Sequence, residues 1–127
     1  MREVKINKEL ILASTSPRRK ILIARIGLPF KFADPNSFET PPLFGESPER
    51  YVSRMAVLKA KYAVDSIEDN QLVVGSDTSV VVNGKILGKP RNANHAWEML
   101  TELRGITHTV ITSIAVSNHH GELCSVT

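Results

Sequence analysis

A short apolar run that leads into hydroxyl residues, a proline and a pair of arginines constrains the fold most strongly. Residues 10–13 read Leu-Ile-Leu-Ala and predict a buried β-strand. Ser16 is a typical N-cap residue, and Pro17 suits the first helical position because it has no N–H to leave unpaired. The stretch therefore predicts a strand that delivers the chain to the start of a helix.

The same stretch is well suited to bind an anion. The first turn of a helix has unpaired N–H groups and lies at the positive end of the helix dipole. The hydroxyl groups of Ser14 and Ser16 and the guanidinium groups of Arg18 and Arg19 can hold phosphate oxygens. We therefore predict a phosphate site at the carboxyl end of the first strand.

Composition favours a single domain over residues 1–127 and gives little support to several other classes of protein. The net charge of +3 is dispersed and aromatic residues make up only 6% of the chain, so no nucleic-acid-binding surface is indicated. The single cysteine, Cys124, rules out an intrachain disulfide. Neither a signal peptide nor a membrane-spanning stretch is evident, so we expect a cytoplasmic protein with no membrane partner.

Helical and extended patterns alternate along the rest of the chain. The predicted helices span 17–26, 48–67 and 93–103, and the predicted strands span 30–33, 71–75, 79–82, 85–87 and 107–117, with one more that begins at 122. Residues 34–47 form a long loop in which Glu39 and Glu46 are expected, from the pattern alone, to be solvated surface carboxylates. Trp97 lies on the apolar stripe of the last helix and is predicted to be a core residue.

Asp77 follows a strand that is predicted to be covered on both faces. Residues 72–74 are apolar without alternation, as expected for such a strand. Open α/β sheets bind their ligands at the carboxyl ends of strands. A turn-forming aspartate is the alternative. Because the chain continues at once into another extended segment, the position favours a metal-binding or general-base carboxylate.

Two lysines could join this carboxylate. Lys59 lies on the apolar face of the second helix, where its amine reaches either water or an anion in a cleft. The Asn83-Gly84 turn predicts a hairpin that returns Lys89 to the vicinity of Asp77, although Lys89 could equally be a surface residue. Several cations beside a carboxylate suggest phosphoryl chemistry with Mg²⁺. The chain has no P-loop sequence.

The ordered set of motifs resembles the signatures of the Maf proteins, over about Leu10 to Val116. These motifs are Ser14–Arg19, Tyr51–Ala56 with Lys59 and Ala60, Gly75–Thr78, Gly88–Pro90 and His108–Thr112. The resemblance implies an α/β fold, with a mixed sheet flanked by helices, related to the inosine triphosphate pyrophosphatases. It implies a nucleoside triphosphate pyrophosphatase that cuts between the α- and β-phosphates and uses a divalent cation (Mg²⁺ or Mn²⁺). It also implies a homodimer.

The resemblance assigns roles to individual residues. The implied substrate-binding residues are Ser14, Ser16, Arg18, Arg19, Glu39 and Thr78; the implied catalytic residues are Asp77, Lys59 and Lys89; and the implied metal ligands are Asp77 and Glu39. Arg18 and Thr78 are similar to the branch that prefers dTTP and UTP. A second branch, which acts on 7-methyl-GTP, has a tryptophan after the proline and Asp-Gln in place of Asp-Thr.

The chain departs from the family pattern in two ways. Ser113 stands where the family usually has glycine, and the family continues beyond the position of Thr127, including a glutamine-containing segment that contributes to its site. We therefore expect the N-terminal and central part of the family fold, incomplete at its C-terminal side. The alternative function is a non-catalytic, nucleotide-binding or partner-binding regulator of septation, and a basic nucleic-acid-binding module is a third hypothesis.

Overall fold

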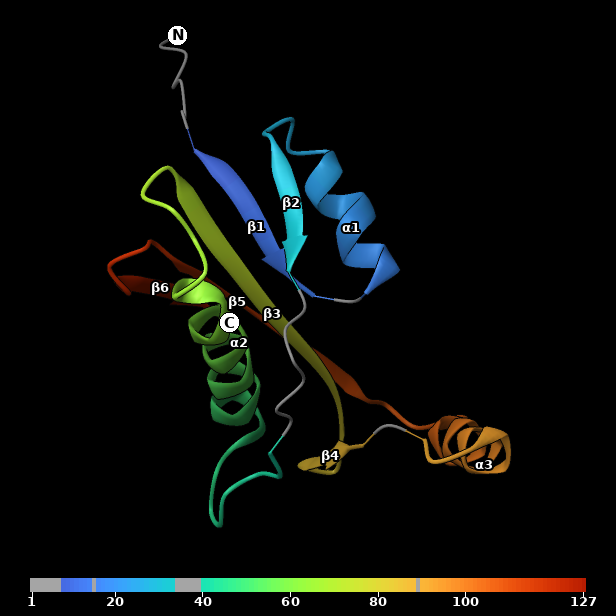
Figure 1. Ribbon diagram of the computed structural model, residues 1–127. Coiled ribbons are helices and arrows are strands. Elements are labelled where there is room, and N and C mark those ends of the chain that lie inside the picture. Colours follow the sequence, from blue (N-terminus) through green and yellow to red (C-terminus); the bar gives the residue numbers. More distant parts are fainter. Residues whose placement is uncertain (1–7, 15, 34–39, 89) are drawn as a thin grey trace, which may run out of the picture.

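The computed structural model describes residues 8–14, 16–33, 40–88 and 90–127. Within these residues, six strands form one mixed sheet with helices on both faces (Figure 1). The elements in chain order are β1 (Glu9–Ala13), α1 (Pro17–Ala24), β2 (Phe30–Ala33), α2 (Pro48–Val64), β3 (Gln71–Val82), β4 (Lys85–Leu87), α3 (Ala93–Leu103), β5 (Thr109–Ser117) and β6 (Leu123–Val126). The predicted α/β class is confirmed.

The long strand β3 organises the sheet. The strand order is β2-β1-β3-β5-β6, and β4 pairs separately with β3. β1 runs parallel to both β2 and β3, whereas β4 and β5 are antiparallel to β3. The sequence predicted separate strands over 71–75 and 79–82, which is wrong. β5 pairs with β3 without interruption from Val73 to Val81, so the intervening residues stay extended.

The two faces of the sheet are covered by different helices. α2 packs on one face, where its alanines and Val73 of β3 form the larger buried cluster. α1 packs on the opposite face, where Ile23 meets Leu10 and Leu12 of β1. Because side chains alternate along a strand, consecutive residues of β3 face different helices.

The predicted helix starts are confirmed. The N-cap side chains of Ser16, Ser47 and Asn92 each accept a hydrogen bond from the backbone N–H three residues later. The first two helices end earlier than predicted, at Ala24 and Val64. The residues that follow α2 donate to carbonyls three positions back, and such bonds form tight turns instead of continuing the α-helix.

α3 contradicts the prediction of a buried stripe. None of its residues is buried, and the side chain of Trp97 is 73% exposed. Figure 1 shows α3 beyond the end of the β3–β4 hairpin, away from the sheet faces that α1 and α2 cover. The amphipathic pattern therefore predicts the helix correctly, but the described residues provide no surface that buries its apolar side. No described helix combines the length and apolar character needed to cross a lipid bilayer.

Candidate active site

The predicted site lies beside a gap in the pairing of β3. β1 pairs with β3 as far as Gly75, and β4 pairs with β3 from Val80 onward. β5 occupies the other side of β3 along this whole stretch, so β1 and β4 share one side. Residues 76–79 therefore have no strand neighbour on that side in the part of the chain that the structure describes. We call these residues the β3 gap.

On the α1 face, hydrogen bonds connect the start of α1 to β3. The buried hydroxyl of Ser14 accepts from the backbone N–H of Ser16 at 3.1 Å and from Nη1 of Arg19 at 3.4 Å. Nη2 of Arg19 donates to Oγ1 of Thr78 at 3.0 Å. The structure thus brings together four of the predicted substrate-binding residues: Ser14, Ser16, Arg19 and Thr78.

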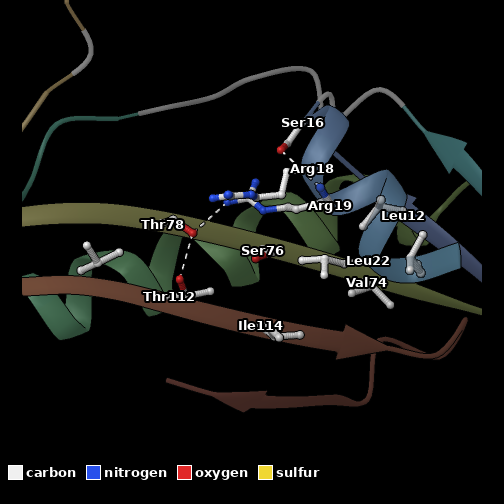
Figure 2. A pocket seen from close by; sticks show the side chains of 12 residues that line it. Leu12, Ser16, Arg18, Arg19, Leu22, Val74, Ser76, Thr78, Thr112 and Ile114 are labelled. Atoms are coloured by element: carbon white, nitrogen blue, oxygen red, sulfur yellow. Dashed lines mark hydrogen bonds between the residues drawn. The ribbon is translucent and has the colours of Figure 1, made fainter. Parts of the chain in front are cut away.

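Three of these residues, Ser16, Arg19 and Thr78, border a cavity of about 480 Å³. Its polar lining consists of Ser16, Arg18, Arg19, Ser76, Thr78 and Thr112, and its apolar lining consists of Leu12, Leu22, Ile23, Val74, Val110 and Ile114. Figure 2 shows the side chains of both arginines above β3, with Arg19 hydrogen-bonded to Thr78. A cavity with a cationic end and an apolar wall can accept a ligand that carries both an anion and an apolar group.

The charge at the start of α1 is unbalanced. Arg18 and Arg19 lie in the first turn, which contains no acidic residue. Cations are unfavourable there because they oppose the positive end of the helix dipole. Among the described residues, no ion pair joins either arginine to a carboxylate. A bound anion would relieve this arrangement.

Asp77 and Lys59 meet on the opposite face of the sheet. Nζ of Lys59 lies 2.9 Å from Oδ1 of Asp77, and the two side chains are only 11% and 10% exposed. Asp77 lies within β3 and not in a turn, and Lys59 reaches it from α2. These two of the three predicted catalytic residues are therefore an ion pair largely shielded from water.

The candidate site is thus divided between the two faces of β3. Asp77 faces α2, and its neighbour Thr78 faces α1. Both belong to the β3 gap, where β1 has already ended. Because no described strand closes this edge, an extended anionic ligand at the gap can reach the arginines on one face and the ion pair on the other.

Glu46 corrects the expectation of a solvated carboxylate. Its side chain accepts hydrogen bonds from Nε and Nη2 of Arg54 at 2.8 and 2.9 Å and from the backbone N–H of Leu43 at 3.0 Å. The hydrogen bonds from Arg54, and then that from Leu43, lower the pKa of Glu46 from 4.5 to about 2. Arg54 also donates to Oγ1 of Thr40 at 3.0 Å. This one side chain of α2 therefore binds both ends of the segment 40–46.

Two predicted site residues, Glu39 and Lys89, lie outside the described residues. The hairpin that leads toward Lys89 is confirmed, with positive φ at Asn83 and Gly84 and with Val80 paired to Leu87. Within the described residues, no group of at least three His, Cys, Asp or Glu side chains could hold a metal ion.

Sequence reasoning gave no individual role to two residues that the structure connects to the site region. Thr112 of β5 lies opposite Thr78, and the two hydroxyl oxygens are 3.0 Å apart. Ser113 is fully buried opposite Asp77, and its hydroxyl donates to the carbonyl of Val126 at 3.1 Å. The alternation of β5 could have indicated Thr112, because a hydroxyl stands there between Val110 and Ile114.

Comparison with known proteins identifies relatives over most of the chain. The family model described as "Maf-like protein" matches residues 9–127. A dTTP/UTP pyrophosphatase of Pelotomaculum thermopropionicum is 45% identical over 109 residues, which are 86% of this chain and 56% of that protein. A 7-methyl-GTP pyrophosphatase of Vibrio vulnificus is 44% identical over 112 residues, which are 88% of this chain and 56% of that protein. The chain thus spans little more than half the length of these curated relatives.

Solved structures agree with the fold at low sequence identity. The dITP/XTP pyrophosphatase of Mycobacterium abscessus matches with a TM-score of 0.56 and 18% identity, over 93% of this chain and 70% of that one. The Ham1 protein of Staphylococcus aureus matches with a TM-score of 0.57 and 16% identity, over 93% and 67%. This likeness shows that the chain shares the fold of these proteins.

Proposed function

The chain belongs to the family of Maf-like proteins, and on that premise we propose that it acts in a nucleoside triphosphate pyrophosphatase. In the proposed reaction, water adds across the anhydride between the α- and β-phosphates. The products are a nucleoside monophosphate and pyrophosphate. Relatives at 44–45% identity carry the names of such enzymes.

One observation carries the proposal: two arginines with no carboxylate partner among the described residues stand at the start of α1. Arg18 and Arg19 oppose the helix dipole there and border the cavity. A polyphosphate supplies the negative charge that this arrangement lacks, and guanidinium groups bind phosphate oxygens in a bidentate manner. The hydroxyl of Ser16 and the N–H groups of the first turn add further donors for the same anion.

The ion pair on the other face supplies the chemistry. The carboxylate of Asp77 orients the attacking water and accepts its proton, as a general base must. The ammonium of Lys59, 2.9 Å from Asp77, holds that carboxylate in place and adds positive charge where the phosphates become more negative. Lys89, which lies outside the described residues, is proposed to neutralise the departing pyrophosphate.

Asp77 is chemically suited to hold a divalent cation at the β3 gap. Mg²⁺ in nucleotide sites is bound by one or two carboxylates together with phosphate oxygens. We propose that Asp77 and Glu39 hold Mg²⁺ or Mn²⁺ when the nucleotide is present. When bound, the cation would neutralise phosphate charge and orient the substrate.

We propose dTTP and UTP as the preferred substrates. Arg18 follows the proline at the start of α1, and Thr78 follows Asp77, as in the branch that the sequence resembles. Identity alone does not separate the two branches, because relatives named for dTTP/UTP and for 7-methyl-GTP match equally well. The proposed assignment therefore depends on these two positions.

A nucleotide screen tests the function. Purified protein is incubated with Mg²⁺ and each of dTTP, UTP, CTP, GTP and 7-methyl-GTP, and pyrophosphate release is measured. We expect release from dTTP and UTP, a loss of at least about 100-fold in Asp77→Asn, and no change in Asp65→Asn, whose carboxylate is exposed at the end of α2. Folded protein that binds UTP without releasing pyrophosphate would instead support the non-catalytic regulator.

The resemblance also supports a cytoplasmic homodimer. Sedimentation equilibrium of the purified chain tests its assembly. A single species of about twice the 14.0 kDa chain mass is expected, and a monomer at all concentrations would contradict the dimer.

A further inference from the structure

Arg19 connects the start of α1 to the middle of the sheet. Its Nη1 donates to Ser14 at 3.4 Å, and its Nη2 donates to Thr78 at 3.0 Å. A guanidinium has five N–H groups, so three of them are without a side-chain partner among the described residues and can donate to a ligand. The hydrogen bond to Thr78 is the shorter of the two, so Thr78 has the larger part in fixing the direction in which those three N–H groups point.

Thr78 is itself held by Thr112. The two residues are directly opposite in the antiparallel pairing of β3 with β5, and their hydroxyl oxygens are 3.0 Å apart. The oxygen of Thr78 accepts a hydrogen bond from Arg19, and one hydroxyl proton lies between the two threonines. The second hydroxyl proton of the pair takes no part in these hydrogen bonds, so it can be donated to a ligand in the cavity that both residues line.

The threonine pair is not needed to align the strands. The β3–β5 pairing continues from Val73 with Ser117 to Val81 with Thr109. In the same row of β5, the neighbours of Thr112 are Val110 and Ile114, both apolar and both part of the cavity wall. The hydroxyl of Thr112 therefore lies between apolar side chains, and its hydrogen-bond partner is Thr78. Thr78 in turn contacts Arg19, so the hydroxyl of Thr112 acts at the end of the cavity where the arginines lie.

We propose that Thr112 is a positioning residue of the phosphate site, which acts through Thr78 to orient the guanidinium of Arg19 and leaves one hydroxyl donor for a phosphate oxygen. The inference rests on the proposed function, since it assumes that the cavity takes a polyphosphate. It adds a polar residue of β5 to a set of polar site residues that otherwise belongs to α2, β3 and the segment from the end of β1 to the start of α1. The chemical class of ligand is a di- or triphosphate.

Binding of inorganic pyrophosphate without a metal tests this inference separately from turnover. Isothermal titration calorimetry is run on the wild type, Thr112→Val, Thr112→Ser and Thr109→Val. The last variant is the matched control, because it makes the same change at an exposed position of the same strand. We expect Thr112→Val to weaken binding about fivefold, the scale of one lost hydrogen bond. Thr112→Ser and Thr109→Val should stay within about twofold of the wild type.

A double-mutant cycle with Arg19→Ala shows whether Thr112 acts through Arg19. If it does, adding Thr112→Val to Arg19→Ala causes less than about twofold further loss. A full fivefold loss in both backgrounds would overturn the positioning role. So would wild-type affinity in Thr112→Val, provided that the wild type binds pyrophosphate. Absence of binding by folded wild-type protein would overturn the phosphate site itself, and the positioning role with it.

Discussion

Replacement of Gly75 by alanine tests the close packing that places Lys59 beside Asp77. A Cβ atom at Gly75 would lie 2.6 Å from the backbone nitrogen of Ala60 and would also collide with the carbonyl oxygen of Ala56. Both are backbone atoms of α2, so neither can rotate away as a flexible side chain could. The helix as a whole must move by roughly 1 Å to restore ordinary contact.

The expected cost is large for a single methyl group. Overpacking of a well-packed core costs about 1–3 kcal/mol, and the rigid backbone on one side puts Gly75→Ala near the upper end. For a chain of this length, a loss of about 3 kcal/mol lowers the melting temperature by about 10 °C. The same movement withdraws Lys59 from Asp77, so pyrophosphate release should fall further than the folded fraction does.

Urea unfolding followed by circular dichroism measures the effect, with Gly88→Ala as the control. Nothing lies within 4 Å of a Cβ at Gly88, and its φ is not in the left-handed region. That variant should stay within about 0.5 kcal/mol of the wild type. Equal stability of the two alanine variants would refute the packing argument. If Gly75→Ala is destabilised but its folded fraction releases pyrophosphate at the wild-type rate, the close packing at Gly75 is not required for activity.

Three further predictions concern other side-chain contacts. The pKa of Glu46 is lowered from 4.5 to about 2, so its stabilising charge is fully present above pH 4.5 and is lost as the pH falls toward 2. The difference in urea midpoint between wild type and Glu46→Gln should therefore shrink between pH 4.5 and pH 2. A constant difference would contradict the ion pair. Lys59→Ala leaves the largely buried Asp77 without the ammonium of Lys59 and should lower the free energy of unfolding by about 3 kcal/mol. Adding Asp77→Ala should recover part of this loss, and purely additive losses would count against the pair. Ser113→Ala should cost about 1 kcal/mol by thermal melting because the carbonyl of Val126 loses its donor, and an unchanged melting temperature would argue against that bond.

The parts of the fold that depend on neighbouring residues were predictable. The starts of the three helices follow from Ser16, Ser47 and Asn92, because a capping side chain bonds a backbone group only three residues away. The hairpin at Asn83 and Gly84 follows from the positive φ that a type I′ turn requires. In each case the controlling contact is local, so the sequence alone contains the information.

The parts that depend on distant contacts were not predictable in this way. Arg54 and Glu46 are eight positions apart and belong to a helix and a loop, so no helical spacing indicates their ion pair. The burial of a helix stripe requires a second surface, and for Trp97 the described residues provide none. The pattern of α3 therefore predicts its shape but not its environment.

The division of the site between two faces could have been predicted and was not. Asp77 and Thr78 are consecutive residues of a strand, and consecutive strand residues point to opposite faces. The two separate strands predicted over 71–75 and 79–82 break the alternation between these residues. Once β3 is continuous from Gln71 to Val82, the separation of the arginines from the ion pair follows directly.

We propose that the arginines of α1 hold the phosphates of a nucleotide while Asp77 and Lys59 promote cleavage between the α- and β-phosphates. The identity of the reaction products is the decisive observation. Phosphorus NMR of UTP incubated with the protein and Mg²⁺ should show UMP and pyrophosphate in equal amounts, and no pyrophosphate with Asp77→Asn. Release of UDP and orthophosphate, or equal amounts of UMP from the wild type and Asp77→Asn, would contradict these roles.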